Sequence, residues 1–263
     1  QILRKFSPFW SAYLAINSLD YLKVKKSFGY YEENRRYFKK CLAEWGNISA
    51  DQVTRKMVSD LLLNESKRFM QQGMTNFKVN SFLRSLKAAF NHAIKHNDLN
   101  MKNPCLFIEF YPIDTKLKYI PSEEEVNEIR SRLSINQKLL FDFVDQTGCR
   151  IMEAIRLQHS DISSNLVTLY TRKAKNSNLT PRRIPIPECL AGLSGEGAVF
   201  KDWNTNPRFL EGKVKWRWHN LRHRRASIWA GSGMTTFEIM TRLGHANLQT
   251  TMRYLQLLGF SRL

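Results

Sequence analysis

Two histidines, an arginine and a tyrosine near the C-terminus have the types and spacing to act together on an anion. His219 and Arg222 are three residues apart, so a helix over 218–229 would project both side chains from one face. His245 falls in a predicted turn between two later helices, and Tyr254 falls in the second of them. Imidazole, guanidinium and phenol groups within reach of one anion are suited to attack on a phosphodiester.

Local capping signals predict the helices that would position these side chains. Thr235 begins one helix with a capping box, and Gly244 supplies the left-handed residue that ends it. Asn247 can cap the helix that follows. His245 is therefore expected in a tight turn, with Tyr254 further along the next helix.

The composition favours a polyanionic partner. The chain has 263 residues, long enough for two domains, and 43% of them are apolar, which is typical of a globular protein. Lys and Arg number 41 against 23 Asp and Glu, a net charge of +18. Because each neutralised phosphate releases counterions, this excess favours nucleic acid. No apolar run is long enough to span a membrane, and no signal-peptide pattern is present.

Neither a metal site nor a disulfide framework is expected. The four cysteines are far apart and form no CxxC pair, which favours a reducing, cytoplasmic location. No paired acidic residues mark a Mg²⁺ site, which argues against a two-metal nuclease. We therefore expect no cofactor and no metal.

The first hundred or so residues are expected to form a helical domain, over 1–102. Helices are predicted over about 7–24 and 30–45, and a third begins at a capping box formed by Ser49 and Gln52. The fourth, over about 75–95, has a clear apolar stripe. The stripe consists of Val79, Phe82, Leu83, Leu86, Phe90 and Ala93.

The opposite face of the fourth helix is polar and basic. Its residues are Lys78, Asn80, Ser81, Arg84, Lys87 and Asn91. One interpretation places this face against DNA, with the cations on phosphates and the amides or arginine on base edges. The alternative is the solvated face of an ordinary helix, and the helix alone does not decide between them.

A proline-punctuated segment over 103–121 is expected to link this domain to a second one over 122–263. Lys116 and Lys118 lie near its end and could follow a phosphate backbone. After the linker, Ser122 and Glu125 form a capping box that begins the second domain.

A glycine break in the second domain places Arg150 at the start of a helix. An arginine there is unfavourable for the helix dipole, which suggests that it is needed for a bound anion. The alternative is that Arg150 only pairs with Glu153 or another carboxylate, and position alone favours this. The neighbouring Cys149 is expected to fill the turn rather than to act as a nucleophile.

Alternating residues over 166–171 and 183–187 predict a β-hairpin around a polar loop. Lys173 and Lys175 would lie on its first strand or in its turn, where an ammonium group could reach into a groove. Exposed hairpin lysines are usually only solvated, and nothing local argues otherwise. Residues 190–213 are expected to form loops and a short helix.

Taken together, four short motifs resemble the signature boxes of the tyrosine recombinases, the phage-integrase family. They are Thr-Gly-Cys-Arg150-Ile-Met-Glu, His219-Asn-Leu-Arg222-His, Leu-Gly-His245 and Thr-Thr-Met-Arg-Tyr254. The order and spacing of the motifs match over the whole second domain. The helical first domain resembles that family's core-binding domain. The resemblance implies a mainly α fold with a small β-hairpin: an N-terminal helical core-binding bundle and a C-terminal mixed α/β catalytic domain.

The resemblance also implies a role for each matching residue. Tyr254 would attack the scissile phosphate, giving a 3′-phosphotyrosyl link and a free 5′-hydroxyl. Arg150 and Arg222 would hold the non-bridging oxygens. His219 would assist proton transfer at the tyrosine or stabilise the phosphoryl group, and His245 would hydrogen-bond the same phosphate.

Two supporting roles complete the carry-over. Glu153 matches the acidic position that supports the first arginine. A hairpin lysine would protonate the leaving 5′-oxygen, but here the turn is longer than usual and the customary following glycine is missing. Similarity favours Lys175, with Lys173 or Arg172 as the fallback.

The sequence thus predicts a site-specific recombinase or integrase that cuts and rejoins double-stranded DNA. The covalent link keeps the energy of the phosphodiester, so resealing would need no ATP. By resemblance, it would act as a homotetramer on two sites. The alternatives are a type IB topoisomerase-like nicking and closing enzyme, which shares the chemistry, and a catalytically idle DNA-binding factor, which would not need Tyr254.

Overall fold

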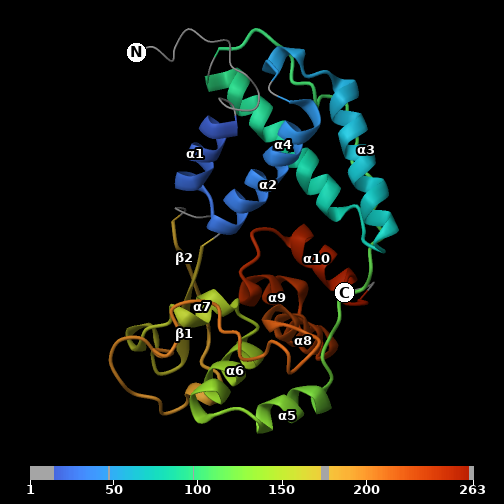
Figure 1. The fold of residues 1–263 in the computed structure, drawn as a ribbon. Helices are drawn as coiled ribbons and strands as arrows, with labels where there is room; N and C mark the ends of the chain where they lie inside the picture. The colour runs from blue at the N-terminus through green and yellow to red at the C-terminus, as the bar shows by residue number, and fades with distance from the viewer. Residues whose placement is uncertain (1–14, 47, 97, 173–177, 261–263) are drawn as a thin grey trace. The chain divides into compact units, whose positions relative to one another are not determined.

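The computed structural model describes residues 15–46, 48–96, 98–172 and 178–260, and it divides into two compact units (Figure 1). The first unit ends at Thr115 and the second begins at Lys116, so the division falls inside the segment expected to be a linker. Within the described residues, helices predominate, and the single sheet is a two-stranded antiparallel hairpin. The expected fold class, mainly α with a small hairpin, is confirmed.

The first unit is a bundle of helices. Its described helices are α1 (Ala15–Lys25), α2 (Phe28–Trp45), the 3₁₀ turn Ala50–Gln52, α3 (Arg55–Gln71) and α4 (Phe77–His96). Of the helix expected over 7–24, residues 7–14 lie outside the described residues. The Ser49–Gln52 capping box is present, but it opens only the 3₁₀ turn. Val53 is extended, and α3 begins later, with Thr54 as its N-cap.

Helix α4 organises the core of this unit, because it contacts each of the other three helices. The apolar stripe expected along it is buried throughout, with no member more than 1% exposed. Phe82 stacks on Tyr37 of α2, with the ring centroids 4.4 Å apart. The period of the apolar residues was therefore a correct guide to the buried face of α4.

The polar face of α4 is partly covered by the chain that follows it. Asn80 is 3% exposed; its side-chain amide donates to the carbonyl O of Tyr111 at 2.9 Å, and its Oδ1 accepts from the Tyr111 N–H at 2.8 Å. Lys87 Nζ donates to the Ile108 carbonyl O at 2.8 Å. The expectation that Asn80 lies on an open face was wrong, because its amide satisfies backbone groups of residues that pack against α4.

The early part of the expected linker belongs to the same packing. Cys105 is fully buried in the first core. Asn103 donates to the Lys87 carbonyl O at 3.0 Å and to Asn91 Oδ1 at 2.7 Å. Lys78 and Arg84 remain exposed, and Ser81 is half-buried.

The second unit contains the hairpin and the remaining helices. They are α5 (Glu123–Ser131), α6 (Ile135–Thr147), α7 (Ile151–Ile155), β1 (Leu166–Thr171), β2 (Thr180–Pro185), α8 (Trp218–Gly231), α9 (Thr236–Leu243) and α10 (Leu248–Gln256). The pairing runs from Leu166 opposite Pro185 to Thr171 opposite Thr180. The short helix expected within 190–213 is absent from this described stretch, which follows the 3₁₀ turn Glu188–Leu190 with turns and loops.

Local capping signals in this unit were predicted correctly. Ser122 and Thr235 each form the expected capping box, at the starts of α5 and α9. Asn247 accepts from the Thr250 N–H and caps α10. Gly148 and Gly244 adopt the left-handed conformation, with φ values of 59° and 67°, and end α6 and α9.

Two apolar clusters hold the helices of the second unit together. One is built around Phe141 and Phe143 of α6, with Trp218 and Leu221 of α8. The other joins α8, α9 and α10, and its buried members are Ala226, Trp229, Ala230, Ile239, Leu243, Leu255 and Leu258. Helix α8 contributes to both clusters, so its position is fixed from two sides. Across the described residues, no helix is long and apolar enough to cross a membrane.

The buried amide of Asn80 gives a direct test of the packing on α4. We expect Asn80→Ala to lower the free energy of unfolding by about 1–3 kcal/mol, because it leaves buried backbone groups of Tyr111 without partners. Chemical denaturation measures this change. Lys78→Ala, on the exposed part of the same helix, is the matched control and should change stability little. Equal effects of the two substitutions would contradict the assigned role of Asn80.

Candidate active site

Arg222, on α8, is a buried cation held by the ends of two other helices. Its side chain is 1% exposed. Nη1 donates to the carbonyl O of Gly148 at 2.8 Å, and Nη2 donates to that of Leu243 at 2.6 Å. These carbonyls lie at the C-terminal ends of α6 and α9, where backbone oxygens lack helical partners and the dipole is negative. Burial, followed by repulsion from Arg150, lowers the pKa of Arg222 to about 10, so it stays charged at neutral pH.

His245 contacts this guanidinium from the turn between α9 and α10. Its Nε2 is 3.2 Å from Arg222 Nη2, and its Nδ1 is 2.9 Å from the Oγ1 of buried Thr251. Because a guanidinium can only donate, Nε2 must accept, and Nδ1 carries the proton and donates to Thr251. Burial, then the charges of Arg222 and Arg150, lower the pKa of His245 to about 4.

Tyr254 lies on α10 between two imidazoles. Its hydroxyl is 2.6 Å from Nδ1 of His223, and its ring lies edge-on to His245 with centroids 5.3 Å apart. Burial raises the pKa of Tyr254 to about 12, although the charges of Arg222 and Arg150 act in the opposite direction. The phenol is therefore protonated at neutral pH.

Arg150 reaches the site through a shared buried carboxylate. It is the N-cap of α7, and its Nη1 donates to Oε1 of Glu153 at 2.9 Å. Arg182, on β2, donates to Oε2 of Glu153 at 2.7 Å, to the hydroxyl of Thr171 at 2.7 Å and to the carbonyl O of Arg242 at 3.0 Å. One network thus joins α7, the hairpin and the end of α9.

The charge state of Glu153 follows from this network. Burial acts to raise the pKa of the carboxyl, but the hydrogen bond and charge of Arg182, with those of Arg150, outweigh it and lower the pKa to about 2. The Arg150 side chain is still 41% exposed. The pairing with Glu153 that was weighed against an anion-binding role is therefore present, and it leaves part of the guanidinium open to a ligand.

His219 sits beside this group but meets different neighbours. Its ring is edge-on to His223 on the next turn of α8, with centroids 4.6 Å apart. His219 and Arg150 line one hollow, together with Trp216 and Trp218. Burial, then the charges of Arg222 and Arg150, lower the pKa of His219 to about 4.

Two residues of the site were missed from the sequence. His223 was visible as the histidine that follows Arg222, four residues after His219 and hence on a neighbouring part of the same helix surface. Arg182 gave no local signal, because it meets Glu153 only through the pairing of the hairpin. Cys149 is 1% exposed, and burial raises its pKa to about 11, consistent with a packing role rather than a nucleophile.

The remaining predicted residues divide into three groups. Lys173 and Lys175 lie outside the described residues. Arg172 and Lys116 are exposed. Lys118 is exposed too, but its backbone N–H donates to the carbonyl O of Leu257, just beyond α10, at 2.7 Å, and its charge contributes to lowering the pKa values of His219 and His223.

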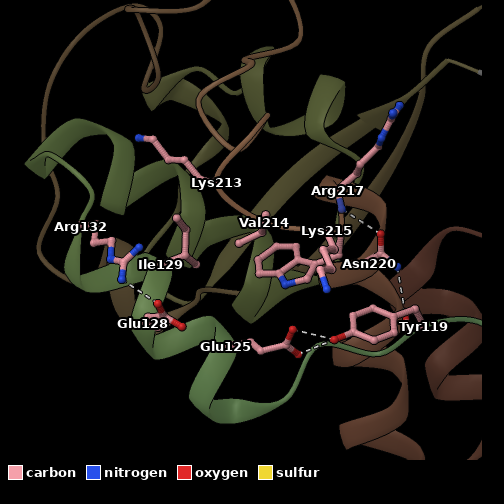
Figure 2. Close-up of a pocket in the computed structure, with 11 residues that line it drawn as sticks. Tyr119, Glu125, Glu128, Ile129, Arg132, Lys213, Val214, Lys215, Arg217 and Asn220 are labelled. Atoms are coloured by element: carbon pink, nitrogen blue, oxygen red, sulfur yellow. Dashed lines mark hydrogen bonds and ion pairs between the residues drawn. The ribbon is translucent and has the colours of Figure 1, made fainter.

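A separate pocket lies where the chain enters α8 (Figure 2). It is lined by residues of α5 and of the 213–217 segment, and it does not include Tyr254. At one end the Tyr119 hydroxyl donates to the Glu125 carboxylate at 2.6 Å, and Asn220 Nδ2 donates to the Tyr119 carbonyl O at 2.9 Å (Figure 2). These bonds fix the first turn of α8. Among the described residues, no group of three or more His, Cys, Asp or Glu side chains is placed to hold a metal ion.

Comparison of the whole fold with solved structures identifies its class. The chain superposes on a lambda integrase dimer bound to a COC′ core site with a TM-score of 0.65 and 14% identity, over 95% of this chain and 79% of that one. The Tn1549 transposon integrase in complex with circular intermediate DNA gives a TM-score of 0.63 and 18% identity, over 94% of this chain and 95% of that one. The XerH site-specific recombinase bound to difH gives a TM-score of 0.58 and 17% identity, over 85% of this chain and 74% of that one. The chain has the fold of the tyrosine recombinases.

The sequence comparison agrees with the structural one. The chain is 24% identical to the ICEBs1 integrase of Bacillus subtilis (strain 168) in an alignment 297 positions long, which covers 94% of this chain and 77% of that protein. No family model matches the sequence. The resemblance to the tyrosine recombinases that the motifs indicated is thus confirmed, whereas the roles of the individual residues remain predictions.

Glu153 provides a test of the network in solution. We expect Glu153→Gln to lower the free energy of unfolding by about 3 kcal/mol at neutral pH, because it leaves two buried or half-buried cations without their counter-charge. The folded-state pKa of Glu153 lies below its ordinary value of 4.5, so this stability is present above 4.5 and is lost as pH falls toward about 2. Denaturation curves recorded from pH 7 to pH 2 should converge for parent and variant.

Glu128→Gln is the matched control, since its pair with Arg132 is largely exposed. This substitution should change stability little at any pH. A Glu153→Gln effect that does not shrink in acid would contradict the charge assignment.

Proposed function

We propose that this chain is a site-specific DNA recombinase that cuts and rejoins double-stranded DNA through Tyr254. One observation carries the proposal: a continuous series of contacts leads from buried Arg222 through His245 to the Tyr254 ring. It occurs in a fold whose solved relatives include integrases and a recombinase bound to their DNA sites. A protein that only bound DNA would not need a phenol at the centre of such a cluster.

In the proposed reaction the Tyr254 oxygen attacks the scissile phosphorus. A 3′-phosphotyrosyl bond forms, the bond to the 5′-oxygen breaks, and that oxygen leaves as a hydroxyl protonated by Lys175 or Lys173. Arg150 and Arg222 stabilise the charge that builds on the non-bridging oxygens, for which fixed guanidiniums are well suited. Reversal of the step with a new 5′-hydroxyl rejoins the strand, so neither ATP nor a metal is required.

The partner in this proposal is a duplex target site. The net charge of +18 supports binding to phosphate that weakens steeply with salt. Lys78, Ser81, Arg84, Lys116 and Lys118 supply candidate contacts. Because the lambda integrase has been solved as a tetramer bound to a Holliday junction, we propose that four copies of this chain act on two sites.

A covalent trapping assay tests the chemistry. Nicked duplex fragments that tile the DNA flanking the gene are incubated with the protein, and adducts that survive denaturation are sequenced. We expect the parent protein to give an adduct at defined positions and Tyr254→Phe to give none, because the nucleophile is lost. Joining of two trapped sites distinguishes a recombinase from a topoisomerase, which would only relax supercoils. A Tyr254→Phe variant that still forms the adduct would refute the proposal.

Arg150 provides a quantitative second test. We expect Arg150→Lys to slow single-turnover cleavage of the mapped site by roughly 100-fold to 1,000-fold, because a lysine cannot present a paired donor to the phosphoryl oxygens. Gel-shift titration should give nearly unchanged DNA affinity, and the melting temperature should show that the variant is folded. A parallel loss of affinity and rate would instead assign Arg150 to binding.

A further inference from the structure

We propose that His223, rather than His219, accepts the phenolic proton of Tyr254 during DNA cleavage and returns it during rejoining. The inference deepens the proposed function and rests on it. The resemblance to the tyrosine recombinases pointed to His219 for proton transfer at the tyrosine. The structure instead places the Nδ1 atom of His223 against the reacting oxygen.

The geometry of the pair suits direct proton transfer. The Tyr254 hydroxyl and His223 Nδ1 are 2.6 Å apart, at the short end of the range in which a general base acts. The two rings pack at a centroid distance of 5.1 Å. His223 is only 5% exposed and lies on α8, which shares an apolar cluster with α10. The contact is therefore held by the packing of two helices rather than by a surface side chain.

His219 is placed for a different task. It lies edge-on to the ring of His223 and lines a hollow with Arg150. Arg150 is the more open of the two arginines expected to hold the phosphate. This position favours a contact of His219 with the phosphoryl group and leaves the phenolic proton to His223.

The charges around His223 keep its imidazole free to accept. The groups that face it are Tyr254 from α10, His219 and Arg222 from α8, and Lys118 from the segment that precedes α5. Burial first, and then His219, Lys118 and Arg222, lower the pKa of His223 to about 4. The imidazole is thus neutral at neutral pH, and a bound phosphate would stabilise the imidazolium that forms as the proton arrives.

The step balances without an added reactant. As the Tyr254 oxygen bonds to phosphorus, its proton moves to His223 Nδ1. The electron pair of the breaking bond leaves with the 5′-oxygen, which takes a proton from the lysine assigned to it above, Lys175 or Lys173. In rejoining, a 5′-hydroxyl attacks the same phosphorus and returns its proton to that lysine, while the imidazolium of His223 gives its proton back to the departing phenolate.

Substitutions at His223 separate proton transfer from simple positioning. In His223→Asn the side-chain oxygen can still accept a hydrogen bond from Tyr254, but it cannot take the proton. We expect His223→Asn and His223→Ala both to slow single-turnover cleavage of the mapped, nicked site by about 100-fold or more. Melting temperatures of both variants report whether they are folded, and a gel shift on the same duplex reports DNA binding.

The pH profile of cleavage assigns the effect. In the parent protein the rate should fall in acid as His223 becomes protonated, and this fall should be absent in His223→Asn. His219→Asn and His245→Asn are the matched variants, and both should keep it. Parent-like cleavage by His223→Asn, or an acid fall that disappears only in His219→Asn, would overturn the assignment. A parent protein that forms no adduct would refute the proposed function itself, and the role of His223 with it.

Discussion

The burial of one positive charge sets the architecture of the second unit. Arg222 is held almost entirely away from solvent, and an unpaired guanidinium there would be prohibitively costly. Two helices must therefore end at the same place, each directing a backbone oxygen at it. The left-handed glycines at positions 148 and 244 make these endings possible. Because α6 and α9 are fixed in this way, the turn that carries His245 and the helix that carries Tyr254 are fixed with them.

The second constraint is the carboxylate of Glu153. It is nearly inaccessible and is surrounded by donors from two arginines and a threonine. Since the donors come from different elements, the carboxylate holds the hairpin against the start of α7, and Arg182 extends the network to the end of α9. At neutral pH the three histidines are neutral and the tyrosine is protonated, so the arginines supply the local positive charge. In the proposed reaction, these fixed cations would stabilise a phosphate with little reorganisation of the site.

Much of this could be predicted from the sequence. Most of the features that could not be predicted share one cause, which is that the partner residue lies far away in the chain. Helix ends at Ser122, Thr235 and Asn247 depend on residues close in the chain, and so they were identified correctly. The stripe of α4 was also correct, because helical periodicity reports burial. Asn80 looked like surface on the same criterion, yet its partner is Tyr111, thirty-one residues away.

Two residues of the candidate site, Arg182 and His223, were missed for the same reason. Arg182 contacts Glu153 only because the hairpin folds back on itself, and no local sequence pattern predicts this contact. His223 stood in plain view next to Arg222, but its partner lies on another helix, thirty-one residues further on. The Ser49 capping signal failed for a different, local reason: it does define a turn, but extended Val53 ends that turn before a helix can grow.

The backbone bond between Lys118 and Leu257 has a mechanical consequence. The chain enters the second unit through a segment that contains Lys118. The main chain of this segment is hydrogen-bonded to the residue just beyond the helix that carries Tyr254. A second hydrogen bond joins Tyr119 to Asn220 on α8, the helix that carries His219 and His223. The entering segment is thus hydrogen-bonded both to α8 and to the end of α10, so it helps to fix the helix that carries His223 relative to the helix that carries Tyr254.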